Sequence, residues 1–236
     1  MIGRRALVAG SILGGISTAR AASEVDLLLV MAVDVSRSID AEEAQMQRQG
    51  YRDAMSDPRV LAAIRSGPTG AIAVAYVEWA GFQYQQLIIP WTRIGSEIEA
   101  RAWSATLERS PRQSMSWTSI SGALSFSRGV LADSPFEAAR RVIDVSGDGR
   151  NNNGPPAEQE RDRLISEDVT INGLPIVNER PNFGYVERGL EEYYRNSVIG
   201  GVGAFLIVAD DFAAFGAAIR RKLIREIASA PASSFG

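Results

Sequence analysis

The chain of 236 residues contains no cysteine and no histidine, and Lys222 is its only lysine. These absences exclude disulfides, thiol nucleophiles and zinc sites built from cysteine and histidine. They also exclude a Ser-His-Asp triad, and a Ser-Lys dyad would have to use Lys222. Any chemistry must therefore use carboxylates, hydroxyls, amides, arginine, tyrosine or the backbone.

The chain also lacks an excess of basic residues. It has 25 Lys and Arg against 28 Asp and Glu, a net charge of −3, so we expect no nucleic-acid-binding surface. With 45% hydrophobic residues, the length suits one α/β domain with a large core. Because no internal repeat or low-complexity linker interrupts the sequence, we expect a single domain over residues 22–236.

The N-terminal residues 1–21 are typical of an export signal. Arg4 and Arg5 precede the apolar stretch 6–16, and residues 19–21 (Ala-Arg-Ala) fit an A-x-A cleavage site. The paired arginines resemble a twin-arginine signal, with a Sec signal or an uncleaved anchor as alternatives. The apolar stretch is short for a membrane span, so we expect a periplasmic or secreted protein with no stable span after cleavage.

Strand and helix patterns alternate along the rest of the chain. Apolar runs predict six strands, over residues 25–33, 70–81, 83–91, 140–146, 169–177 and 203–209. Helical spacing is found over residues 40–56, 96–109, 119–132, 155–168 and 186–196, and again after residue 210. This alternation predicts a doubly wound, mostly parallel six-stranded sheet with helices on both faces. The short link between the second and third strands predicts one antiparallel edge strand.

The last predicted helix carries a basic run, formed by Arg220, Arg221, Lys222 and Arg225. Basic residues favour the C-terminal half of a helix, where they oppose the negative end of its dipole. We expect this run to form a solvated helix face rather than a binding patch.

Oxygen-bearing side chains gather where the first predicted strand ends. Asp34, Ser36 and Ser38 form a D-x-S-x-S pattern, and a spacing of two brings them to one side of extended backbone. A carboxylate with hydroxyls is a hard-oxygen donor set suited to Mg²⁺, Mn²⁺ or Ca²⁺. In a doubly wound sheet, ligands bind at this carboxyl edge of the strands.

Two further oxygen-bearing residues fall at positions that meet the same edge. Asp148 lies between two glycines at the end of the fourth strand, whereas Asp144 lies inside that strand. Thr118 precedes a helix, where a hydroxyl can bind a metal or simply cap the helix.

Together these three segments resemble the von Willebrand factor A domain, also called the integrin inserted domain. The resemblance covers nearly all of residues 22–236. It extends to a secreted bacterial branch of unknown function through the stretches "RRVIDVSGDGRNNNG", "VTINGLPI" and "VIGGVGAF".

The resemblance implies a metal-ion-dependent adhesion site. Its ligands would be Asp34, Ser36, Ser38, Thr118 and Asp148, holding Mg²⁺, with Mn²⁺ or Ca²⁺ as alternatives. In this family a carboxylate from a protein partner completes the coordination. The implied function is exported, metal-dependent protein binding rather than catalysis.

Two other functions compete with this interpretation. "SGDGRNNN" resembles a motif of the haloacid dehalogenase phosphatases, in which Asp34 would be the nucleophile. Ser36 then stands where a general acid is needed, Lys222 lies far beyond the motif, and Asn153 replaces its final aspartate. The second alternative is a structural envelope domain without a metal.

Several residues near these motifs have simpler expected roles. Three tryptophans in apolar patterns are expected in the core: Trp79, Trp91 and Trp103. Trp117 adjoins Thr118, so it could border a ligand surface. Arg37 and Arg150 could attract an acidic partner or pair with nearby carboxylates. The asparagines 151–153 are interpreted as a turn.

Overall fold

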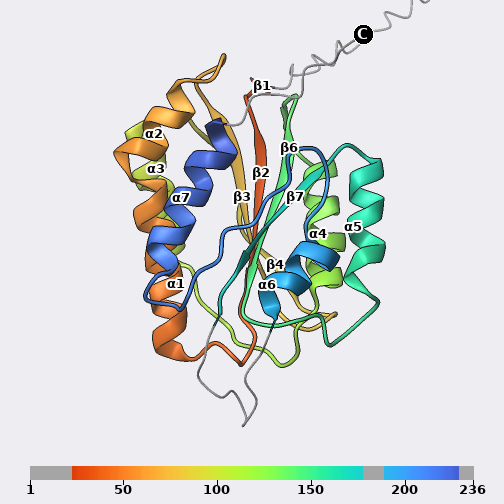
Figure 1. Cartoon of the computed structure of the whole chain (residues 1–236). Helices are drawn as coiled ribbons and strands as arrows, with labels where there is room; N and C mark the ends of the chain where they lie inside the picture. Colours follow the sequence, from red (N-terminus) through yellow and green to blue (C-terminus); the bar gives the residue numbers. More distant parts are fainter. Residues whose placement is uncertain (1–22, 178–188, 229–236) are drawn as a thin grey trace, which may run out of the picture.

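A computed structural model describes residues 23–177 and 189–228. Its main sheet has the strand order β4-β3-β2-β6-β7 (Figure 1). The strands are β2 (Leu28–Asp34), β3 (Ile72–Trp79), β4 (Gln85–Ile94), β6 (Arg141–Gly147) and β7 (Thr170–Pro175). All neighbours run parallel except β4, which is antiparallel to β3 at the edge, so the predicted edge hairpin is confirmed. A separate short pair joins β1 (Ser23–Glu24) to β5 (Phe136–Glu137).

The central strands are apolar because helices cover both faces of the sheet. Every residue of β2 and β3 is buried. Along β2, alternate side chains such as Leu29 and Met31 join one core cluster, whereas Leu28 and Val30 join the other. This period of two explains why the sequence of a doubly covered strand reads as a continuous apolar run.

The helices divide into two layers (Figure 1). One face carries α1 (Ala41–Met55), α2 (Pro58–Arg65), α3 (Glu97–Arg109) and α7 (Phe215–Ala228). The other carries α4 (Ile120–Ala132), α5 (Ala157–Ser166), α6 (Leu190–Tyr193) and the π-helical turn η1 (Tyr194–Val198). No helix within the described residues is long and apolar enough to cross a membrane. The export signal 1–21 and the start of the predicted helix 186–196 lie outside the described residues.

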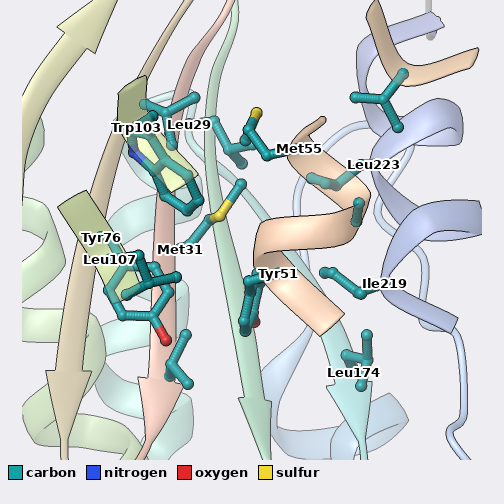
Figure 2. Packing of buried hydrophobic residues seen from close by; sticks show 14 of the residues in the cluster. Leu29, Met31, Tyr51, Met55, Tyr76, Trp103, Leu107, Leu174, Ile219 and Leu223 are labelled. Carbon is teal, nitrogen blue, oxygen red and sulfur yellow. The ribbon is translucent and has the colours of Figure 1, made fainter. Parts of the chain in front are cut away.

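The first helical layer packs on the sheet through aromatic side chains (Figure 2). The ring of Tyr76 on β3 meets those of Tyr51 on α1 and Trp103 on α3 edge to face, with centroids 5.4 and 5.9 Å apart. Trp79 and Trp103 are fully buried, as predicted. Trp91 is only partly buried, because it lies on the edge strand, and its indole N–H donates to the carbonyl of Val130 (2.9 Å).

The helix α1 begins directly after the first oxygen-rich loop. Asp40 caps it in a reciprocal capping box with Glu43, at 2.9 and 3.0 Å. The following helix α2 was not predicted, although its start signal is present in the sequence. Asp57 accepts the backbone N–H of Arg59 (2.8 Å), and Pro58 occupies the first helical turn.

The predicted sixth strand, residues 203–209, is not a regular strand. It meets β7 only through isolated parallel bridges, Gly173 with Leu206 and Ile176 with Ala209. The reason is Pro175, which lies between the two bridges and has no N–H to donate to this neighbour. The main sheet therefore has five strands rather than six.

The expectation that the basic run is a solvated face is wrong for Lys222, whose side chain is fully buried. Its ammonium group pairs with Asp144 on β6 (2.5 Å) and with Glu226 one turn later (2.8 Å). The amide of Asn172 on β7 donates to the same Glu226 carboxylate (2.8 Å) and accepts the backbone N–H of Phe205 (2.9 Å). Lys222 therefore links helix α7 to strand β6 through buried ion pairs. Helical periodicity in the sequence does not reveal such a contact between elements.

Candidate metal site

The first loop holds Asp34 in a fixed orientation at the end of β2. One carboxylate oxygen, Oδ1, accepts the backbone N–H of Ser36 (2.7 Å), and the Gln47 amide donates to the Asp34 carbonyl (3.3 Å). The other oxygen, Oδ2, is buried and has no hydrogen-bond partner. A buried carboxylate oxygen without a partner is costly, and a cation at this position would satisfy it.

A chain of hydroxyls joins the first loop to the third. The Ser36 and Ser38 hydroxyls lie 2.8 Å apart, and the Ser38 hydroxyl donates to Asp148 Oδ1 (2.7 Å). The contact follows from topology: β2 and β6 are parallel neighbours, so the loops that leave them meet at one edge. The two predicted aspartates are thus brought together through Ser38.

Glycine at position 147 allows the Asp34 carboxylate and the Tyr194 hydroxyl to lie close to the end of strand β6. A Cβ there would lie 2.9 Å from Asp34 Oδ2 and 3.0 Å from the Tyr194 hydroxyl. Since real Cβ atoms essentially never show contacts under 3.0 Å, any larger residue would displace the Asp34 oxygen and would also crowd the Tyr194 hydroxyl. Tyr194 was not predicted as part of the site, because nothing in the sequence shows that the π-helical turn η1 reaches β6.

Thr118 lies buried at the same edge, with its hydroxyl 3.5 Å from where a Cβ of Gly149 would be. Sequence reasoning left open whether this hydroxyl caps helix α4. The structure assigns the cap to Ser119, whose hydroxyl accepts the backbone N–H of Gly122 (3.1 Å). The Thr118 hydroxyl is therefore not needed for capping, which leaves it available for a ligand.

The turn Asn151–Asn153 fastens the second and third loops to each other. Its three amide oxygens accept, in order, the backbone N–H of Ser121 (3.0 Å), Thr118 (2.8 Å) and Phe82 (2.7 Å). The Asn152 N–H also donates to the Thr118 carbonyl (2.9 Å), which completes a reciprocal pair. The sequence predicted a turn here, but the consecutive asparagines also set the position of Thr118 relative to Asp148.

The electrostatics of the site favour a cation. Burial, and then the nearby Asp148 charge, hold the pKa of Asp34 well above its ordinary value. The same two effects, burial first and then the Asp34 and Asp148 charges, raise the pKa of the Tyr194 hydroxyl. A divalent cation between the two carboxylates would relieve their repulsion.

The donor set fits a hard divalent ion. Residues 23–177 and 189–228 contain no cluster of three or more acidic, histidine or cysteine side chains. Neutral hydroxyls must therefore complete any metal site at this edge. Two aspartates with serine and threonine hydroxyls are oxygen donors of the kind that Mg²⁺ and similar ions accept.

The residues that flank the site differ in how they are held. Arg150 is exposed, lies over the Tyr193 ring (5.4 Å from the centroid) and donates to the carbonyl of Gly189 (3.3 Å). Arg37 is also exposed beside the first loop. Trp117 is 63% exposed, and that it borders a ligand surface stays a prediction.

The asparagine turn gives a testable prediction about positioning. Asn152→Ala removes the amide that holds Thr118, so we expect divalent affinity to fall by on the order of tenfold, as for other groups that orient metal ligands. Titration calorimetry with Mg²⁺ measures this change. Asn153→Ala is the matched control, because it frees Phe82 rather than Thr118 and should change affinity far less. Equal affinities of wild type and Asn152→Ala would show that the turn does not position a ligand.

Several solved structures share this fold, among them one named as von Willebrand factor type A. Proximal thread matrix protein 1 from the mussel byssus, with its MIDAS motif occupied by zinc, aligns with 86% of this chain and 46% of its own at 18% identity and a TM-score of 0.61. The von Willebrand factor type A protein from Catenulispora acidiphila aligns with 86% and 43% at 13% identity and a TM-score of 0.60. The pilus adhesin SpaC from Lactobacillus rhamnosus GG aligns with 86% and 31% at 14% identity and a TM-score of 0.61.

The chain thus spans less than half the length of each of these proteins, and at such identities the likeness shows the fold alone. No curated protein sequence matches the chain. A family model does match, over residues 24–231, which is nearly the whole domain. The chain therefore has the von Willebrand factor A fold and belongs to the family described as Protein of unknown function (DUF1194).

Proposed function

We propose that this protein is an exported, metal-dependent protein-binding domain that captures an acidic group of its partner. The observation that carries the proposal is the hydrogen-bonded series Ser36–Ser38–Asp148 beside the unpartnered Oδ2 of Asp34. These groups converge from loops that are distant in sequence. Convergence of hard oxygens around an unsatisfied carboxylate is what a cation site requires.

The proposed metal ligands are Asp34, Ser36, Ser38, Thr118 and Asp148, and the ion is Mg²⁺, with Mn²⁺ or Ca²⁺ as alternatives. Mg²⁺ held by few protein carboxylates keeps positions for outside oxygens. When bound, it would act as the positive centre that attracts a partner's carboxylate. The two aspartates would balance the charge of a divalent ion, and the ion would supply the positive charge that attracts an outside carboxylate.

The partner and the location follow from the same proposal. A pilus adhesin among the structural neighbours supports binding to another protein. The arginine pair and apolar stretch of residues 1–21 support export, to the periplasm or beyond. The net charge gives no support to a nucleic-acid partner.

Neither alternative gains support from the geometry. A phosphatase of the haloacid dehalogenase type needs a lysine near Asp34, but Lys222 is enclosed in the interior and paired with Asp144 and Glu226. A structural domain without a metal leaves the buried Oδ2 of Asp34 unexplained. Metal-dependent binding accounts for this oxygen and requires no lysine at the site.

The test measures metal binding and metal-dependent capture separately. Calorimetry of the purified residues 22–236 should show one Mg²⁺ site, and Mg²⁺ should raise the melting temperature relative to protein in EDTA. A periplasmic extract should then yield a partner that is retained with Mg²⁺ and released by EDTA. Absence of any Mg²⁺, Mn²⁺ or Ca²⁺ binding would contradict the proposed site. A phosphatase assay of the same sample tests the enzymatic alternative.

A further inference from the structure

Exposed apolar side chains surround the candidate metal site. Phe82, Met115 and Trp117 are 44%, 38% and 63% exposed. Met115 lies on the loop between α3 and α4 and is held against the first loop, because it forms a parallel bridge with Ser36 and its carbonyl accepts the N–H of Arg37 (2.9 Å). Large apolar side chains exposed near one another on a soluble domain indicate a surface that is covered in use.

Trp117 lies on the same loop as Met115, whereas Phe82 lies on the connection between β3 and β4 and contacts the third loop. Trp117 immediately precedes Thr118. Phe82 is held by Asn153 through its backbone N–H, and its ring lies so close to Gly154 that a Cβ there would meet it at 2.5 Å. Each of these exposed apolar residues thus lies on or against one of the three loops of the candidate site, and together we call them the apolar rim (Phe82, Met115 and Trp117).

Trp117 is held outward at a cost to the isolated domain. Its φ is +75°, the left-handed region that non-glycine residues rarely adopt. Gly81 packs closely against this part of the loop, because a Cβ there would lie 2.9 Å from the Ser116 carbonyl oxygen and 3.2 Å from the Trp117 Cβ. The N–H of Ser119 is fixed just beyond, on the carbonyl of Ala80 (2.7 Å). Both the strain and the exposure would be offset by a partner that covers the indole.

We infer that the apolar rim binds the side chains on either side of the captured carboxylate. The partner is then a protein segment whose acidic residue is flanked by apolar residues, rather than any acidic surface. This inference rests on the proposed function, because the metal supplies the charge complementarity for the carboxylate. The rim contributes contact area and excludes water, which strengthens the attraction between ion and carboxylate.

Two blocked pentapeptides test the inference. The apolar peptide has the sequence Gly-Phe-Asp-Leu-Gly. The serine peptide has the sequence Gly-Ser-Asp-Ser-Gly. With saturating Mg²⁺, the apolar peptide should bind on the order of fivefold to tenfold more tightly, as expected for an aromatic contact at an interface. Trp117→Ala should reduce its affinity to that of the serine peptide. Ile98→Ala is the matched control, since Ile98 is 81% exposed but lies on α3.

A glycine variant separates binding from stability. Trp117→Gly accepts the positive φ without strain, so its melting temperature should equal or exceed that of the wild type while peptide selectivity is lost. Equal binding of both peptides, binding of neither with Mg²⁺ bound, or selectivity that survives Trp117→Ala would overturn the inference. Dimerisation that depends on Trp117 would also overturn it, by identifying a second copy as the occupant. Failure of Mg²⁺ alone to bind would instead contradict the proposed function.

Discussion

Lys222→Ala should lower the free energy of unfolding by about 3–5 kcal/mol, the range for removing one partner of a buried ion pair. The lysine is fully buried, and its ammonium group contacts both Asp144 and Glu226. Without it, two carboxylates remain in the interior with no cation between them. Urea denaturation followed by circular dichroism measures the loss. Exposed ion pairs contribute at most about 1 kcal/mol to stability, so a loss below this value would contradict the buried network.

Two controls show whether charge is the cause. Arg221→Ala removes the neighbouring basic residue, which is exposed, and should change stability by no more than about 0.5 kcal/mol. The triple variant K222M/D144N/E226Q removes all three charges while roughly keeping their volumes. It should recover much of the lost stability, because replacing a whole buried ion cluster is often neutral. If the triple variant is as unstable as Lys222→Ala, packing rather than charge is responsible.

The pH dependence gives an independent check of the same network. Burial raises the pKa of Asp144 from 3.8 to about 7, although the Lys222 charge opposes the rise. A carboxyl whose pKa is raised on folding stabilises the protein below its unfolded pKa, and this contribution is lost as the pH rises through the folded pKa. Removing Lys222 raises the Asp144 pKa further. The variant should therefore lose less stability at pH 5 than at pH 8.

The buried network also shows what sequence patterns can and cannot predict. The strands β2, β3 and β6 were predictable because a strand covered on both faces is mostly apolar, and the parallel order then places Asp34 and Asp148 at one edge. Lys222 was predicted to be solvated because helical periodicity records only which residues share a face. Whether a charge on that face meets solvent or Asp144 depends on how α7 packs on β6.

The candidate site likewise contains residues that the sequence could indicate and residues that it could not. Its candidate oxygen ligands could be proposed from the sequence because each follows or precedes an element whose end is visible there. The supporting groups could not, since the asparagine turn acts through amides that reach across to Thr118, and Tyr194 arrives from a π-helical turn. Local signals specify where loops begin, whereas the contacts between loops arise only from the assembled sheet.

Asp34→Ala should abolish divalent binding while leaving the domain folded. It removes the carboxylate whose Oδ2 has no other partner, so the loss of Mg²⁺ affinity should exceed about 100-fold, the upper range for groups that only orient ligands. The metal-free variant should melt no lower than metal-free wild type. Burial and Asp148 hold the pKa of Asp34 high, so its ionised carboxylate is unfavourable without a cation. Calorimetry and thermal melts with Mg²⁺ or EDTA measure both effects.

Asp144→Asn provides the matched control, because Asp144 is an equally buried aspartate on the neighbouring strand β6. Its carboxylate faces Lys222 rather than the loops, so Mg²⁺ affinity should stay nearly unchanged wherever the variant is folded. The two variants should thus separate the two roles of buried aspartate in this chain. Asp34→Ala should lose metal affinity and keep its stability, whereas Asp144→Asn should keep metal affinity and change in stability. A loss of Mg²⁺ affinity in Asp144→Asn as large as in Asp34→Ala would contradict the assignment of Asp34, rather than Asp144, as the metal ligand.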